Sequence, residues 1–204
     1  KSGTTGAANV IGNNVKDGIA LVNASTNNAI AYNTVGLNAG KNAKAANKNG
    51  ITITSSNTNN INNNTISGNT NDGLVLDASN TNTVSANIVG TSAALATNDL
   101  GNGATGISLL NGAASNTVGT TNTVAYNQEA IVVDGATTIQ NKISQNSVYC
   151  NLSNNTVPGI HLKAAGNINF VSPWISGQTP GLDTLGKALV MGGFTAALGS
   201  TVEI

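Results

Sequence analysis

A short alternating apolar phrase recurs six times along the chain. It first appears as Gly18-Ile19-Ala20-Leu21, in which Ile19 and Leu21 would face one side of a strand and Ala20 the other. Equivalent phrases start at positions 50, 73, 106, 130 and 159, with alanine in place of glycine at 130. The spacings are 32, 23, 33, 24 and 29 residues. Self-similarity at such a period is typical of a solenoid.

Two further strand cues follow each phrase, and helical periodicity is nearly absent. The first pair is Ile30 and Val35, and most later pairs are also five residues apart: Ile61 and Ile66, Val84 and Val89, Val118 and Val124, Ile143 and Val148. Three short strands per period indicate an all-β, right-handed parallel β-helix of about six coils. Each strand would pair with its equivalent about 4.8 Å away along the axis.

Asparagine supplies about one residue in six, far above ordinary usage. We expect it at the bends, because it tolerates the left-handed backbone region and its side chain can bond nearby backbone. Stacked asparagines can also form ladders from coil to coil. The asparagines stop at Asn169, which predicts a β-helix over residues 1–169 and a boundary near residue 170.

The periods alternate between short and long. The long periods carry extra segments at 36–49, 90–105 and 149–158, between the last strand of one coil and the next phrase. All three should emerge at one edge of the solenoid, and insertions on one side of a solenoid often build a binding face.

Charge and composition exclude several classes of protein. The formal net charge is zero, there is no arginine, and we expect no basic patch, so we expect no nucleic-acid partner. No apolar run approaches the roughly 20 residues that cross a membrane. The single cysteine, Cys150, excludes an internal disulfide, and we expect it to be half-buried.

The middle of the chain resembles a known bacterial repeat. The residues that carry the likeness are Asn87-Ile88-Val89-Gly90-Thr91, Leu100-Gly101-Asn102, Gly106-Ile107-Ser108-Leu109 and Ala114-Ser115-Asn116-Thr117-Val118-Gly119. This pattern is similar to the β-helix repeat of large exported surface proteins in the pectate-lyase-like superfamily, on its non-enzymatic branch. The resemblance implies that residues 170–204 form a linker or cap and the truncated start of an immunoglobulin-like β-sandwich domain.

Acids fall into one column just before the phrases. The column reads Asp17, Asn49, Asp72, Thr105, Glu129 and Pro158. Its acids occur in every second coil, hence about 9.6 Å apart, which is too far for a retaining glycosidase pair and at the outer limit for an inverting pair. Asp-Gly is also a routine turn pair. Asp17, Asp72 and Glu129 are therefore candidate ligand or metal contacts, with turn formation, calcium or carbohydrate binding, and catalysis all open.

The outward column of the phrase strands holds no carboxylate. It reads Ala20, Thr52, Val75, Ser108, Val132 and His161, so we assign no catalytic residue, no metal ligand and no cofactor, with Ca²⁺ as the alternative. His161 has no acid in its own column and reads as a surface residue. Asp134 and Lys163 should form a surface ion pair one coil apart. Tyr32 and Tyr126 either stack on a sugar or pack on an edge.

These features predict a structural or adhesive segment of a large exported bacterial cell-surface protein, without catalysis. Its location would be extracellular or at the cell surface. Its partner would be a polysaccharide or another surface protein. One alternative is a carbohydrate-binding module or a polysaccharide lyase or hydrolase that uses the long-loop edge. Another is a filament or sheath subunit that associates end to end.

Overall fold

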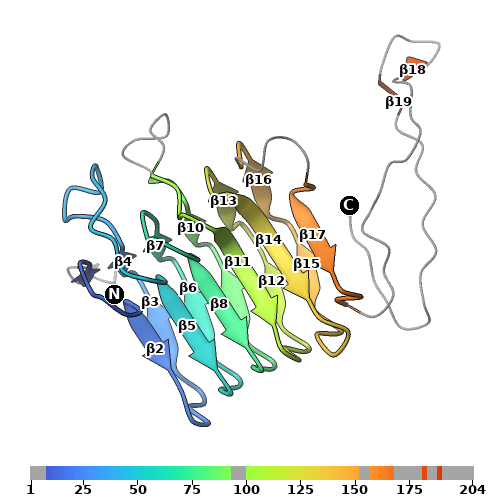
Figure 1. Cartoon of the computed structure of the whole chain (residues 1–204), viewed down its shortest axis with the longest axis horizontal. Helices are drawn as coiled ribbons and strands as arrows, with labels where there is room; N and C mark the ends of the chain where they lie inside the picture. Colours follow the sequence, from blue (N-terminus) through green and yellow to red (C-terminus); the bar gives the residue numbers. More distant parts are fainter. Residues whose placement is uncertain (1–7, 93–99, 152–156, 168–180, 183–187, 190–204) are drawn as a thin grey trace, which may run out of the picture.

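A computed structural model describes residues 8–92, 100–151, 157–167, 181–182 and 188–189. Its strands stack into three parallel sheets, and each coil contributes one strand to each sheet (Figure 1). The chain is therefore a right-handed parallel β-helix, as the repeated phrase predicts. The described part contains no helix that could cross a membrane.

The three sheets correspond to the three predicted strand cues. The repeated phrases form sheet 1, whose strands are β2 (Ile19–Leu21), β5 (Ile51–Thr54), β8 (Leu74–Asp77), β11 (Thr105–Leu110), β14 (Glu129–Asp134) and β17 (Ile160–Lys163). Sheet 2 comprises β3 (Ala29–Ala31), β6 (Asn60–Asn62), β9 (Thr83–Ser85), β12 (Thr117–Gly119) and β15 (Lys142–Ser144). Sheet 3 comprises β1 (Val10–Ile11), β4 (Thr34–Val35), β7 (Thr65–Ile66), β10 (Ile88–Val89), β13 (Thr123–Ala125) and β16 (Ser147–Tyr149).

The last part of the chain contributes one described pair of strands. Strand β18 (Gly181–Leu182) pairs antiparallel with β19 (Ala188–Leu189). The other residues from 170 to 204 lie outside the described residues, so the linker and the immunoglobulin-like domain stay predictions.

The core consists of stacked columns of like residues. In sheet 1, Ile51 is in register with Leu74, which is in register with Ile107, and all three side chains are fully buried. Sheets 2 and 3 each contribute one such column, through the residues at the predicted strand cues. Burying each of these side chains contributes about 1.5–3 kcal/mol to folding.

Each of the three corners of the coil carries a ladder of asparagines. The ladders run Asn28-Asn59-Asn82-Asn116-Asn141-Asn167 between sheets 1 and 2, Asn33-Asn64-Asn87-Asn122-Asn146 between sheets 2 and 3, and Asn14-Asn47-Asn69-Asn102-Asn127-Asn151 between sheets 3 and 1. All twelve asparagines that are buried among the described residues belong to them. The predicted ladders are thus present, and they recur at every corner.

The hydrogen bonds of one rung show how a ladder works. Asn64 donates from its backbone N–H and its Nδ2 to Oδ1 of Asn87, both at 3.0 Å. The same Nδ2 also donates to the carbonyl of Ile30 in the preceding coil and to the carbonyl of Asn62. Only an amide side chain offers both the acceptor and the paired donors that this pattern uses.

The left-handed backbone of the bends lies one residue before most ladder asparagines. Asn63, Ala86 and Thr121 have φ of 53°, 52° and 65°, and each precedes a ladder asparagine. The expectation that the bend asparagines themselves adopt this conformation is therefore wrong for most rungs. Asparagine is therefore needed at the corner for its side chain, which hydrogen-bonds to buried backbone groups, and not for its own backbone conformation.

The glycine that opens the phrase faces a ladder. A Cβ built on Gly50 would lie 2.5 Å from the carbonyl oxygen of Gly73 and 2.8 Å from Nδ2 of Asn69. Backbone and ladder approach so closely here that a side chain would force them apart. The phrase therefore combines a core strand with a tight corner.

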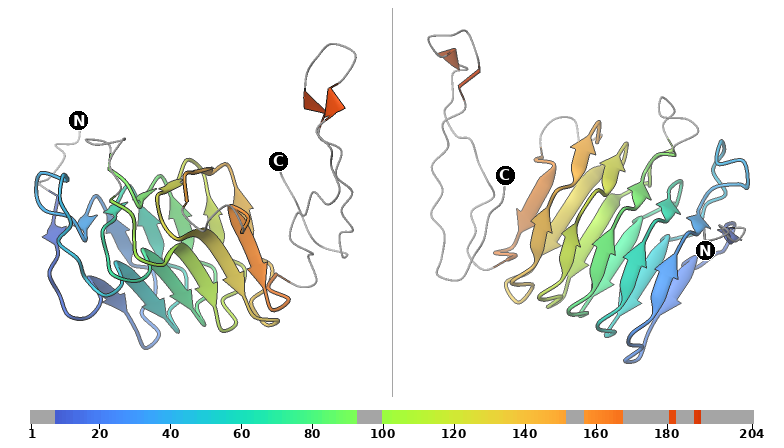
Figure 2. Two further views of the ribbon diagram at one scale, coloured as in Figure 1. Left: turned by 45° about the horizontal axis from the view of Figure 1, so that its top comes forward. Right: turned by 180° about the vertical axis from the view of Figure 1, so that it is seen from behind.

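The long segments leave the coil where sheet 3 passes to sheet 1, which we call the 3/1 edge (Figures 1 and 2). Contacts join the first two long segments across the short coil between them. Lys44 Nζ donates to the carbonyl of Gly101 at 3.0 Å, and Ser92 Oγ donates to the carbonyl of Lys41 at 2.9 Å. The prediction that these segments share one edge is confirmed for the described residues.

The ladder predicts that replacing two asparagines close in sequence, Asn64 and Asn62, has very different effects on the free energy of unfolding. Replacing Asn64, which is 1% exposed, with alanine should lower the free energy of unfolding by about 2–4 kcal/mol, because several buried groups lose their partners. Asn62→Ala, on the outer face of β6, should change it by less than about 0.5 kcal/mol. Denaturant unfolding of the two variants checks this, and equal effects would contradict it.

Candidate functional site

The column of acids stacks as the sequence predicts. Asn49 Nδ2 donates to Oδ1 of Asp17 at 2.9 Å, and the backbone N–H of Asp72 donates to Oδ1 of Asn49 at 3.2 Å. Thr105 pairs in register with Glu129. Asp17, Asp72 and Glu129 therefore lie in alternate coils of one column, and the column itself is a mixed ladder.

Asp72 connects two coils through both carboxylate oxygens. Oδ1 accepts from the backbone N–H of Thr105 at 2.8 Å, and Oδ2 accepts from Ser108 Oγ at 3.0 Å. Ser108 belongs to the outward column of sheet 1, one coil further on. The carboxylate thus holds the start of β11 against the end of the preceding corner.

Glu129 makes the equivalent connection further along the face. Its Oε2 lies 3.0 Å from His161 Nδ1, and its Oε1 accepts from Lys163 Nζ at 2.8 Å. His161 therefore does have an acidic partner, which reaches it from the neighbouring column of the preceding coil. His161 has no acid in its own column, as predicted, but this partner was not expected. A glutamate side chain is long enough to cross between columns.

The partner of Lys163 also differs from the expectation. Asp134 and Lys163 are in register one coil apart, as predicted, but Lys163 forms its ion pair with Glu129. The Glu129 carboxylate sits between two donors, and its side chain is only 23% exposed. It is therefore the better-placed partner.

The pKa of Glu129 lies below its ordinary value. Partial burial raises the pKa, and this effect is outweighed by the hydrogen bonds from Lys163 and His161 and by the charges of the same two residues. The ionised carboxylate is thus stabilised in the folded state. Its role in the described structure is to clamp β17 to β14.

The two candidate tyrosines, Tyr32 and Tyr126, lie at different corners of the coil. Tyr32 is 60% exposed at the corner between sheets 2 and 3, whereas Tyr126 lies at the 3/1 edge. Tyr126 instead contacts Tyr149, with ring centroids 6.2 Å apart and ring planes at 81°. This edge-to-face pair was missed in the sequence, although the register of β13 and β16 implies it.

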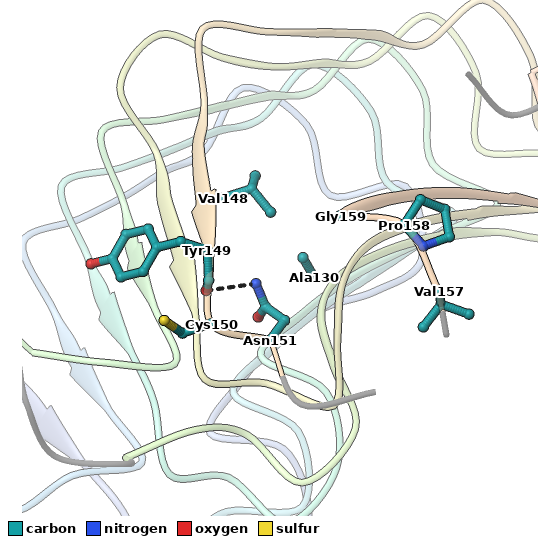
Figure 3. Close-up of a pocket in the computed structure, with 8 residues that line it drawn as sticks. All are labelled: Ala130, Val148, Tyr149, Cys150, Asn151, Val157, Pro158 and Gly159. Carbon is teal, nitrogen blue, oxygen red and sulfur yellow. Dashed lines mark hydrogen bonds between the residues drawn. The ribbon is translucent and has the colours of Figure 1, made fainter. Parts of the chain in front are cut away.

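A cavity of about 200 Å³ lies beside Tyr149 at the last described coil (Figure 3). Its lining is Ala130, Val148, Tyr149, Cys150, Asn151, Val157, Pro158 and Gly159. In the close-up Val148 points toward the cavity, and the Tyr149 ring points to the opposite side of its strand. Cys150 is exposed, so the expectation that it is half-buried is wrong.

Four lysines lie in the corner and long segment at the opposite end of the 3/1 edge. Lys48 donates from its backbone N–H to the carbonyl of Lys16 at 3.0 Å, so the two residues stack one coil apart. Lys41 and Lys44 lie in the adjoining long segment. We call Lys16, Lys41, Lys44 and Lys48 the lysine cluster. Aligning Asp17 with Asn49 in the sequence would have placed Lys16 and Lys48 one above the other. The lysine cluster corrects the expectation of no basic patch.

Comparison with known proteins identifies a family. The family described as periplasmic copper-binding protein (NosD) matches residues 37–172, which is more than half of the chain. The chain belongs to this family. No match was found among curated proteins or among solved structures. Membership of a family described as periplasmic agrees with the prediction of an exported β-helix protein.

The described residues of this NosD-family chain do not fit a copper site. Copper favours imidazole and sulfur ligands, and the described residues include one histidine and one cysteine. Nδ1 of His161 is already hydrogen-bonded to Glu129. No group of three or more His, Cys, Asp or Glu side chains lies close enough to hold a metal ion in the described ranges. The buried polar groups of the described coils are backbone groups and asparagine amides in ladders, whereas a copper centre needs several imidazole or sulfur ligands close together.

The Glu129 clamp predicts an acid-dependent loss of stability. Because the folded-state pKa of Glu129 is lowered, its contribution is present above the unfolded pKa of about 4.3 and is lost as pH falls through the folded pKa. Glu129→Gln should lower the free energy of unfolding by about 1 kcal/mol at pH 7. Denaturant titrations between pH 7 and pH 3 should show this difference shrink as the pH falls below the unfolded-state pKa and vanish below the folded-state pKa.

The matched control is Asp134→Asn on the same strand. The Asp134 carboxylate makes no hydrogen bond within the described residues, so this variant should change stability by less than about 0.5 kcal/mol at any of these pH values. A Glu129→Gln variant as stable as the parent at pH 7 would show that the clamp contributes nothing.

Proposed function

We propose that this chain is a stiff structural and adhesive segment of an exported protein, and that it performs no catalysis. The observation that carries the proposal is the use made of its carboxylates. Asp17, Asp72 and Glu129 each accept hydrogen bonds from the next coil, and Asp77 accepts from Asn111 Nδ2 of the next coil at 2.8 Å. These acids hold coils together.

Stiffness follows from the way successive coils are joined. Three asparagine ladders, three sheets and the acid column all connect one coil to the next, so bending the axis would strain several hydrogen-bonded columns together. Six coils at about 4.8 Å each span about 25–30 Å. Such a rod lengthens simply by adding coils, which suits a spacer that carries a binding surface away from its anchor.

The adhesive part of the proposal rests on the 3/1 edge. The joined long segments, the lysine cluster and the Tyr126–Tyr149 pair all lie there. Binding surfaces of solenoids are built by such insertions along one side.

A polysaccharide lyase or hydrolase is the rival function. It would need free carboxylates close enough to act together on one bond. Asp72 instead has both oxygens bonded within the protein, and the next acids of its column lie two coils away. This arrangement favours the non-catalytic proposal.

Incubation of the full chain with polygalacturonate and alginate tests the proposal. We expect the polymers to keep their length, with no increase in reducing ends over the heat-denatured chain, while beads coated with the folded chain adhere to bacterial cells. Turnover of either polymer, abolished by Asp72→Asn or Glu129→Gln, would overturn the non-catalytic role. Beads that adhere no better than albumin-coated beads would overturn the adhesive role.

A further inference from the structure

We propose that the 3/1 edge binds an anionic polysaccharide that lies along the β-helix axis. The lysine cluster would pair with its acidic groups, and the Tyr126–Tyr149 pair would pack against its sugar rings. This inference rests on the proposed adhesive function and names the chemical class of its partner.

The lysine cluster concentrates positive charge on a chain whose formal net charge is zero. It holds four of the six lysines in the described ranges, and the described acids beside it are Asp17 and Asp72, which stack on either side of Asn49. The local balance is thus four cations against two anions. The ammonium groups of Lys16, Lys41 and Lys48 make no hydrogen bond or ion pair within the described part of the chain, so they are available to a ligand.

The segment that carries the cluster is held in place by its own contacts. Leu37 is fully buried and forms an antiparallel bridge with Lys44, and Asn38 Oδ1 accepts from the backbone N–H of Asn42 at 3.1 Å. Ser92 fixes the carbonyl of Lys41 from two coils away. A preformed surface loses less conformational entropy on binding than a loose loop would.

The spacing along the edge suits a linear polymer. Lys16 and Lys48 are one coil apart, and Tyr149 lies four coils beyond Lys48, or about 19 Å along the axis. Tyr149 is 40% exposed and presents an aromatic ring beside Tyr126. A ligand that uses both ends must be extended and must carry apolar ring faces as well as negative charge, as an acidic polysaccharide does.

Lysine suits this partner better than it suits nucleic acid. Arginine, which binds phosphate through two parallel hydrogen bonds, is absent from the whole chain. Lysine is a mobile point charge that pairs with carboxylate or sulfate groups without a fixed geometry. Membership of a family described as periplasmic also favours a glycan of the cell envelope over an intracellular polymer.

Titration of the full chain with a galacturonate decamer tests the proposal. The double variant Lys41→Gln/Lys48→Gln should weaken binding at least about tenfold and flatten its dependence on salt. Ala29→Glu/Thr83→Glu makes the same change of charge on exposed positions of sheet 2 and should change affinity less than about twofold. Lys44 stays unchanged because its Nζ bonds to Gly101.

A length series separates the two halves of the site. Tyr149→Ala should weaken decamer binding about fivefold and leave unchanged the binding of a galacturonate dimer, which is too short to reach from the lysines to the tyrosines. A neutral maltodextrin of equal length should not compete.

Three outcomes would overturn the proposal: no decamer binding, equal losses in the lysine and control variants, or tighter binding to a DNA duplex or to phosphatidylglycerol vesicles. None of them requires polymer cleavage, so they are distinct from failure of the non-catalytic role. Cleavage of the decamer, by contrast, would overturn the proposed function even where the lysines still bind it.

Discussion

The asparagine ladder at each corner is the interaction on which the rest of this β-helix depends. A chain that bends three times per coil turns backbone N–H and carbonyl groups inward at every bend, and buried unpaired polar groups are costly. Asn87, which is fully buried, satisfies groups in the coils on both sides of its own. The apolar columns supply the driving force for burial, and the ladders provide hydrogen-bond partners for the backbone groups that are buried with them at the corners.

The ladder also explains where variation is allowed. In the first long segment Asn47 returns the chain to the 3/1 ladder after the excursion from residue 38, and in the short coil Asn69 does so three residues after β7. The length between strand and rung can therefore change without disturbing the neighbouring coils. Loops of different length can therefore be carried on regularly stacked coils. The 3/1 edge, where these loops lie, also carries the lysines and the tyrosine pair.

The stacked coils of the β-helix could be predicted from the sequence because they are periodic. The phrase from Gly18 to Leu21, its five copies and the two strand cues that follow them predicted the three sheets, the register of the phrase strands and the stacking of Asp17, Asp72 and Glu129. The contact of Glu129 with His161 escaped prediction because it runs diagonally, and its direction depends on side-chain rotamers. The full lysine cluster escaped because Lys41 and Lys44 lie in an insertion, where the repeat provides no register.

Hydrogen exchange of the asparagine side-chain amides tests the central role of the ladders most directly. NMR of the folded chain should show the Nδ2 protons of Asn64, Asn87 and Asn122 protected from exchange to the same degree as the backbone amides of β8 and β11, since both open only when coils separate. The Nδ2 protons of Asn62, on the outer face, should exchange rapidly. Rapid exchange of all these side-chain amides, with the strands still protected, would contradict the account.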